Sequence, residues 1–298
     1  MSTRLPGLLA KRLGKASDKL KKALLGPWPP VVHVVRLEGP IGTRGTFANA
    51  LSLEGLAETL VNAFEQGEPK AVALLLNSPG GSPAQSMLLY ARIRALAKEK
   101  EIPVYAFAED VAASGGYMLA CAADEIYATE SSIVGSIGVV AATFGFEKLI
   151  ERVGVERRLY TAGSRKSLLD PFLPVNEDDV ERLKVVQQSI HDAFKDLVRK
   201  ARAGRLNGEE SELFSGEFWT GTRAQALGLV DGIGDVRTIM REKFGTDVRL
   251  RLIEPQKRFS LRSLAASRAR AHAGSREEML DGLIGVLEAR ALWSRFGL

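Results

Sequence analysis

The sequence predicts a protein of the α/β class, because short apolar strands alternate with amphipathic helical segments from residue 31 onward. With 298 residues and 45% hydrophobic content, the chain is long enough to bury a sizeable core. The predicted strands are 31–37, 71–77, 103–108, 125–129 and 155–162. The predicted helices between them are 46–66, 82–99, 114–123 and 145–153.

The second half of the predicted domain is mainly helical. A long charged helix over 176–203 is expected to begin at Asn176 as its N-cap, with acids in its first turn, and to end near Gly204. After it we predict a short helix at 222–227, a glycine-rich turn at 228–234, a helix at 235–244 and a strand near 247–253.

Charge divides the chain into three predicted parts. Residues 1–25 hold seven Lys or Arg and one acid, a net of +6, and residues 255–298 hold eight against four, a net of +4. Subtracting both from the total of +5 leaves −5 for the middle. We therefore predict a basic helix and linker at 1–30, a catalytic domain at 31–254 and a basic helical tail at 255–298. No nucleic-acid motif accompanies the charge, so nucleic acid is not expected as a partner.

The N-terminal segment has leucines at helical spacing on one side and lysines on the other. A basic amphipathic helix over 2–25 either attaches to an anionic membrane surface or packs on a neighbouring subunit. No stretch is long and apolar enough for a transmembrane helix, and no signal peptide is recognised. With the single cysteine Cys121, these features predict a protein of the cytoplasm or of the periphery of the inner membrane.

Two glycine-rich turns follow predicted strands and precede predicted helices. The first is Asn77-Ser78-Pro79-Gly80-Gly81, where paired glycines allow a backbone amide to approach a ligand. The second contains Ser114-Gly115-Gly116, and Ser114 there is either a helix N-cap or a nucleophile. The amide of Gly115 and one amide from the first turn would together form an oxyanion hole.

A serine nucleophile needs a base, and the three histidines do not suit the role. His33 alternates with valines in a strand, His191 lies within the long helix, and His272 lies in the charged tail. Their scarcity favours a lysine, which can act as a base only if burial lowers its pKa. Lys166 follows a predicted strand and precedes apolar residues and a proline, where a lysine can turn inward.

The order and separation of four motifs are more specific than any one of them. NSPGG, ASGGYMLACAAD, SSIVGSIGVV and the G-x-x-K-x-x-x-x-P stretch at Lys166 resemble the bacterial signal peptide peptidase (SppA/SohB-like) family over roughly 31–250. The resemblance implies Ser114 as nucleophile, Lys166 as base and Ser136 as the residue that orients the lysine. It further implies oxyanion amides at Gly81 and Gly115.

The resemblance also implies a fold, a reaction and an assembly. The fold would be a Clp/crotonase-like spiral of ββα units, with basic amphipathic helices at both ends. The reaction would be serine endopeptidase hydrolysis of peptides, such as cleaved signal peptides, through an acyl-enzyme and without a metal or organic cofactor. The subunits would form a homo-oligomer. Members of the family commonly carry a membrane anchor before the protease domain, whereas this sequence has only the basic helix at 2–25.

Three alternatives stay open at this point. A Clp-type Ser/His/Asp protease would need a histidine after the nucleophile helix, and 134–140 contains none. A crotonase-like acyl-CoA enzyme would use the oxyanion hole but leave Ser114 and Lys166 without a role. A non-catalytic membrane-associated scaffold would keep the fold alone. Cys121 is interpreted as a small core residue rather than a second nucleophile.

Overall fold

A computed structural model describes residues 28–42, 50–163, 165–254 and 290–297 of the chain. The predicted basic helix at 2–25, and most of the tail predicted at 255–298, lie outside these residues, as does the start of the helix predicted at 46–66. The described strands are β1 (Val31–Glu38), β2 (Ala71–Ser78), β3 (Val104–Ala113), β4 (Glu125–Ala128), β5 (Ile133–Gly135), β6 (Phe218–Thr220), β7 (Gly232–Ile233) and β8 (Arg249–Leu252). The described helices are α2 (Leu53–Glu65), α3 (Pro83–Lys100), α4 (Gly115–Ala120), α5 (Glu147–Arg152), α6 (Glu177–Ala201), α7 (Glu210–Leu213), α8 (Gly221–Ala226) and α9 (Val236–Phe244).

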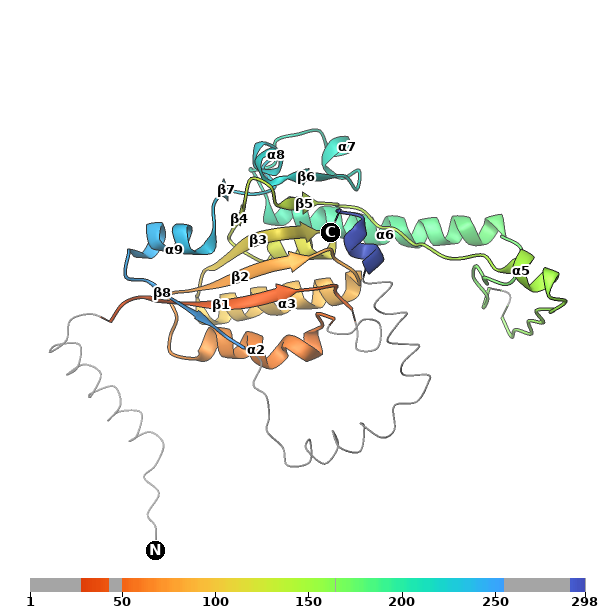
Figure 1. Cartoon of the computed structure of the whole chain (residues 1–298), viewed down its shortest axis with the longest axis horizontal. Helices are drawn as coiled ribbons and strands as arrows, with labels where there is room; N and C mark the ends of the chain where they lie inside the picture. Colours follow the sequence, from red (N-terminus) through yellow and green to blue (C-terminus); the bar gives the residue numbers. More distant parts are fainter. Residues whose placement is uncertain (1–27, 43–49, 164, 255–289, 298) are drawn as a thin grey trace, which may run out of the picture.

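The strands form one branched sheet at the centre of the body (Figure 1). Its order is β6-β5-β3-β2-β1-β8, and every pair on this path is parallel except β5 with β6. The long strand β3 pairs with β4 through Tyr105–Ala108 and with β5 through Val111–Ala113, so the sheet divides along β3. This arrangement confirms the predicted α/β class.

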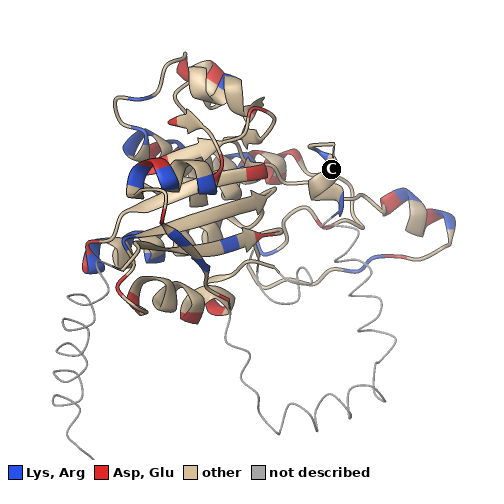
Figure 2. Cartoon of the chain, turned by 60° about the vertical axis from the view of Figure 1, so that its left-hand side comes forward, with Lys and Arg blue, Asp and Glu red and all other residues tan. Residues whose placement is uncertain are grey.

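Apolar residues cover both faces of the sheet. The larger cluster lies between the sheet and α2, α3, α4 and α6, and it includes Leu60, Leu74, Leu89 and Phe194, all at most 1% exposed. A smaller cluster on the other face joins β1 to β4 with Ile239 and Met240 of α9. Most charged residues lie on the helices and loops around this core (Figure 2). A core on both faces is what buried parallel strands require.

Helix ends agree with the sequence signals where polar caps are present. The side chains of Ser52, Ser82, Asn176 and Asp235 accept hydrogen bonds from backbone amides in the first turns of α2, α3, α6 and α9. Each of these four helices begins at the residue after its cap.

Residues 139–175, here called the arm, leave the body between β5 and α6 (Figure 1). The strand predicted at 155–162 falls in the arm, and the structure has no strand there: the residues are exposed and make no ladder. Its alternating pattern is present in the sequence, but no partner strand lies beside it in the described chain. The arm contains one short helix, α5.

Candidate active site

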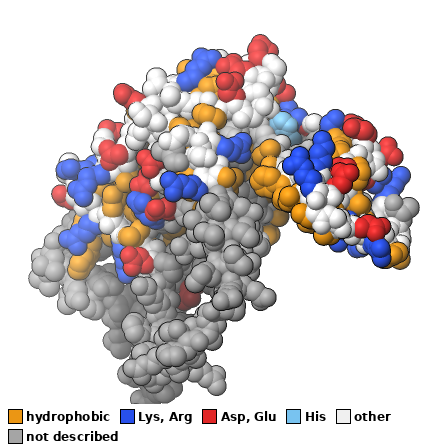
Figure 3. All heavy atoms as spheres, turned by 45° about the vertical axis from the view of Figure 1, so that its right-hand side comes forward, with side chains coloured by type: hydrophobic (Ala, Val, Ile, Leu, Met, Phe, Trp, Pro, Cys, Tyr) orange, Lys and Arg blue, Asp and Glu red, His pale blue; other side chains and the backbone are white. Residues whose placement is uncertain are grey.

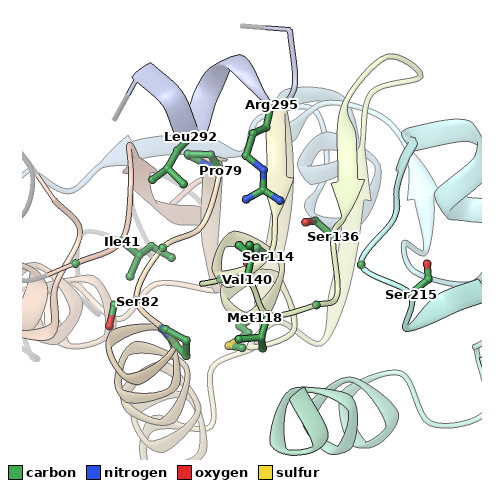
Figure 4. Close-up of a pocket in the computed structure, with 17 residues that line it drawn as sticks. Ile41, Pro79, Ser82, Ser114, Met118, Ser136, Val140, Ser215, Leu292 and Arg295 are labelled. Atoms are coloured by element: carbon green, nitrogen blue, oxygen red, sulfur yellow. The ribbon is translucent and has the colours of Figure 1, made fainter. Parts of the chain in front are cut away.

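A pocket of about 620 Å³ lies at the carboxyl ends of the central strands (Figure 4). The segments that follow β1, β2, β3 and β5 supply Ile41, Gly81, Ser114 and Ser136 to its lining. Because these strands are parallel, their carboxyl ends meet at one edge of the sheet, where α/β folds place their sites. The structure therefore brings four regions of distant sequence to one cavity.

Ser114 has a strained backbone and a hydroxyl that does not cap the helix that follows it. Its φ of +53° and ψ of −122° lie where non-glycine residues are rare, and the conformation is held by a 2.8 Å hydrogen bond from its amide to the Gly135 carbonyl. Although Ser114 stands directly before α4, its side chain makes no capping hydrogen bond. The N-cap alternative for this serine is therefore not what the structure has, and the Ser114 side chain lines the pocket instead.

The two glycine-rich turns interlock beside Ser114. A Cβ added at Gly80 would lie 2.7 Å from the Ser114 Cβ, and one at Gly116 would lie 2.5 Å from the Ser78 carbonyl oxygen. Side chains at these positions would separate the turns. The pairing of the two turns that the sequence predicted is thus a direct backbone contact, possible only with glycine at the points of approach.

Two amides at this contact are available to a ligand. Gly81 has φ +140°, and a Cβ there would lie 2.1 Å from the Ile41 carbonyl oxygen, so the turn is pressed against the segment after β1. Within the described chain, neither the Gly81 amide nor the Gly115 amide donates a hydrogen bond. Both residues line the pocket next to Ser114.

Ser136 reaches the same pocket from the segment after β5. It also has a positive φ, +52°, and its amide donates a 2.7 Å hydrogen bond to the Glu217 carbonyl. The residue is 5% exposed, and Figure 4 shows its hydroxyl beside the cavity. Gly135 before it has φ +111° and lies against the Trp219 ring, which leaves no room for a side chain.

Lys166 is the one predicted site residue that the structure does not bring to the pocket. It lies on the arm, where its backbone amide closes a turn onto the Gly163 carbonyl, and it is exposed. The pocket lining contains no residue from 141 to 175. The inward orientation expected for this lysine is therefore not found among the described residues of one chain.

The two described histidines lie outside the pocket lining. His33 is fully buried, and its Nδ1 donates a 2.8 Å hydrogen bond to the Ala63 carbonyl. His191 on α6 places Nε2 3.0 Å from the Ile137 carbonyl. His272 lies outside the described residues. Within the described residues, no group of three or more His, Cys, Asp or Glu is placed to hold a metal ion.

A buried polar cluster packs against α4. Arg202, at the end of α6, is 1% exposed and forms a bidentate ion pair with Asp231 at 2.7 and 3.0 Å. Its Nε donates to the Gly228 carbonyl, and the Tyr117 hydroxyl of α4 donates to the Leu229 carbonyl. Burial raises the pKa of the neighbouring Cys121 thiol to about 12, which agrees with its interpretation as a core residue.

Several pocket residues were not among the site residues predicted from the sequence. Ser82, Met118, Val139 and Gly216 line the cavity because their elements pack around it. Leu292 and Arg295 come from the far end of the chain, in the predicted basic tail. No local motif marks either of them.

The chain was compared with known protein families. The model of peptidase family S49 matches residues 96–246, which is 151 of the 298 residues and includes Ser114, Ser136 and Lys166. The chain belongs to peptidase family S49. The prediction of a serine-type peptidase related to SppA and SohB is confirmed at the level of the family.

Curated relatives agree with S49 membership. The chain is 35% identical over 202 residues to the chloroplastic serine protease SPPA of Arabidopsis thaliana, covering 67% of this chain and 29% of that protein. It is 35% identical over 165 residues to a putative signal peptide peptidase SppA of Enterococcus faecium, covering 55% of this chain and 47% of that protein. Among solved structures, the 1510-N membrane-bound stomatin-specific protease matches with a TM-score of 0.49 and 15% identity, over 77% of this chain and 100% of that one.

One further relative has a different name. A Brucella abortus protein named Na(+)/H(+) antiporter NhaA is 48% identical over 305 residues, covering 99% of this chain. The S49 chain spans only 39% of that protein's length, and the aligned part includes the residues that match the peptidase family. No helix in the described part of the S49 chain has the length and apolarity to cross a bilayer.

Proposed function

We propose that this S49 chain is a serine endopeptidase in which Ser114 is the nucleophile. The observation that carries the proposal is the strained Ser114, whose hydroxyl is not used for capping and which lies between two interlocked glycine turns. A strained turn that presents a serine into a pocket is a common way to expose a nucleophile. An ordinary N-cap serine would have extended φ and ψ and a hydrogen bond to the first turn.

The amides of Gly81 and Gly115 form the proposed oxyanion hole. Both glycines line the same cavity as Ser114, and neither amide donates to another atom of the described chain. Fixed amides of this kind stabilise the negative charge that develops on the carbonyl oxygen as Ser114 attacks. Gly81 keeps this position only without a side chain, since a Cβ would meet the Ile41 carbonyl oxygen.

The base is proposed to be Lys166 of a second copy of the chain. Among the described residues that line the pocket of one copy, Arg295 has the only charged side chain, and an arginine cannot be deprotonated in a protein. Lys166 stands exposed on the arm, away from the pocket of its own chain. If it acts as the base, another copy must receive it.

The arm has the character of an interface element. Its apolar side chains are exposed, among them Phe144 at 78% and Tyr160 at 89%, and Figure 3 shows hydrophobic side chains along it and where it meets the body. Exposed apolar surface of this extent is typical of a contact with another protein. We therefore propose a homo-oligomer in which the arm packs on a neighbouring copy.

Lys166 would move with the arm as one unit. The Phe146 amide donates to the Pro171 carbonyl, and the Phe146 ring stacks on Phe172 with centroids 5.6 Å apart. Arg157 and Asp170 add an ion pair at 3.0 Å. These contacts close the arm into a loop that holds its own shape, so docking it can place Lys166.

The proposed reaction is an acyl transfer in two steps. Neutral Lys166 takes the proton of Ser114, the serine oxygen attacks the peptide carbonyl, and the amine product leaves with a proton from the lysine. Water then attacks the acyl-enzyme with the same lysine as base. Ser136, whose hydroxyl lies beside the cavity, would hold the neutral amine towards Ser114. This chemistry uses no metal or organic cofactor.

The proposed substrates are extended peptides, such as cleaved signal peptides and other peptides released from membranes. Val139 and Val140 line the pocket, and their backbone groups make no hydrogen bond within the described chain, so a peptide can pair with them as an added strand. The name of the Enterococcus relative supports signal peptides as one class. The basic segment 2–25 would bring the enzyme to an anionic membrane surface.

A complementation experiment tests the proposal. Ser114→Ala and Lys166→Ala are each expected to be inactive, but their co-expression with different tags should restore about a quarter of wild-type peptide hydrolysis, because one site in four receives an intact serine and an intact lysine. Failure of the purified mixed oligomer to hydrolyse peptides would place both residues in one chain. Lys166→Arg should be inactive, since arginine keeps the charge but cannot act as a base; an active variant would exclude Lys166 as the base.

A further inference from the structure

The segment 290–297 is packed against the edge of the pocket. Phe296 is 8% exposed and contacts Val111 and Ala113 of β3, with Trp293 against the same cluster. The Phe296 ring also meets the Phe218 ring edge-on, with centroids 5.2 Å apart. Two aromatic side chains therefore anchor this segment to the strands that lead to Ser114.

Other side chains of the same segment face the cavity. Leu292 lies in the short helical stretch 290–294, and Arg295 lies in the turn that follows it. Leu292 and Arg295 both line the pocket, and Figure 4 shows the Arg295 guanidinium directed towards the region of Ser114 and Ser136. Phe296 is buried and Trp293 is partly buried, so their packing holds the backbone of the segment that carries Arg295 at the edge of the pocket.

Arg295 gives the pocket a positive charge. Of the 17 described residues that line the cavity, it is the only one with a charged side chain. Within the part of the chain that the structure describes, no carboxylate lies within 4.0 Å of its guanidinium. The pocket thus combines this cation with the free amides of Gly81 and Gly115, and all three groups favour a negatively charged ligand.

We infer that Arg295 is a specificity residue that binds a carboxylate of the peptide substrate, an inference that rests on the proposed peptidase function. A guanidinium recognises a carboxylate through two parallel hydrogen bonds, which gives direction as well as charge. The carboxylate comes either from an acidic side chain near the cleaved bond or from the carboxyl terminus of a short peptide. Arg295 takes no part in the chemistry and acts through substrate binding.

Matched peptide pairs test this inference in the full chain. One series exchanges Glu for Gln at each position in turn around the cleaved bond, and a second compares a free carboxyl terminus with its amide. The wild type should prefer the carboxylate member of one series by about five-fold in kcat/KM, mainly through KM, as expected for an ion pair that solvent can reach. The preference should weaken as salt is raised.

Variants at Arg295 separate its role from general effects. Arg295→Ala should abolish the preference, Arg295→Lys should keep part of it, and Arg295→Glu should reverse it. Arg290→Ala is the matched control, because Arg290 is exposed on the same segment but does not line the pocket; it should keep the wild-type preference. Circular dichroism of each variant checks that the fold is retained.

Two results overturn the inference and are distinguishable. If hydrolysis depends on Ser114 but shows no carboxylate preference, or if Arg295→Ala and Arg290→Ala behave alike, Arg295 is not a specificity residue while the peptidase proposal stands. If no peptide is hydrolysed in a Ser114-dependent manner, the proposed function fails and this inference fails with it.

Discussion

Removing the carboxylate of Asp231 should destabilise the protein more than removing its partner Arg202. The two side chains differ in burial: that of Arg202 is 1% exposed and that of Asp231 is 19% exposed. Asp231→Ala leaves a buried guanidinium with only the Gly228 carbonyl as acceptor. Arg202→Met leaves a carboxylate that still accepts from the Ile126 amide at 2.7 Å and from Arg205.

The expected cost of Asp231→Ala is about 3–5 kcal/mol, the range for a buried charge that loses its partner. For Arg202→Met we expect about 1–3 kcal/mol, because Asp231 keeps hydrogen-bond donors and some solvent. The double variant Arg202→Met, Asp231→Leu should cost less than the sum of the two single changes, since no unpaired charge remains.

Urea denaturation at one fixed protein concentration measures these differences. With a slope of about 3 kcal/mol per molar, Asp231→Ala should lower the midpoint by about 1–2 M. A loss below about 1 kcal/mol, or equal losses in the two single variants, would contradict the account of this pair as a buried support behind α4.

Burial of Asp231 also predicts an acid response. Burial raises the pKa of its carboxyl, but hydrogen bonds from Arg202 and Ile126 outweigh burial and leave the pKa below its ordinary value of 3.8. The pair's stabilisation is therefore complete above that ordinary value and is lost as the pH falls towards the lower folded-state pKa. The stability difference between wild type and Asp231→Ala should shrink only below about pH 4.

Three further predictions concern other parts of the chain. Gly81→Ala should lower the free energy of unfolding by about 2–4 kcal/mol and abolish hydrolysis, because its Cβ meets the Ile41 carbonyl. The control Gly204→Ala, at φ +74° with open space around it, should lower that free energy by about 1 kcal/mol. Equal shifts of the melting temperature in the two variants would refute the clash. Burial lowers the pKa of His33 below 6.5, so the free energy of unfolding should fall as pH drops through about 6.5, and less so in His33→Gln; parallel pH profiles would refute this. Deleting 2–25 should release the protein from anionic vesicles at low salt in a flotation assay, and unchanged binding would refute surface attachment through that segment.

Much of the fold was predictable because the strands and helices of the core carry strong local patterns. The sequence places β1, β2 and α3 within one residue of their observed ends. It ends the third strand at residue 108, whereas β3 continues to Ala113, because Val111–Ala113 pair with β5 and Ala112 pairs with Ser78 of β2. Those partners lie on other strands, so the sequence of β3 alone does not reveal them.

The remaining differences are tertiary in origin. Strands β5, β6 and β7 have two or three residues each. Their pairing, β5 with β3, β6 with β5 and β7 with β4, makes them strands rather than their composition. The predicted strand at 155–162 has the alternating pattern of a strand, but it has no partner strand in the described chain and does not form one.

Some residues of the candidate site follow from local sequence motifs, and others depend on tertiary packing. Ser114, Gly81 and Gly115 were found because glycine turns between strands and helices are local signals, and the parallel sheet brings those turns together. The place of Lys166 depends on where the arm packs, which one chain does not determine. Arg295 lies at the pocket because Phe296 is buried and Trp293 is partly buried against β3. No residue near them in the sequence predicts that contact.

Peptide hydrolysis by the wild type and by Ser114→Ala, with mass spectrometry of the products, tests the central claim most directly. The account predicts defined internal cleavage by the wild type and a loss of at least about 10³-fold in kcat for Ser114→Ala, with the fold unchanged by circular dichroism. Retention of wild-type hydrolysis by Ser114→Ala would contradict the assignment of Ser114 as the nucleophile.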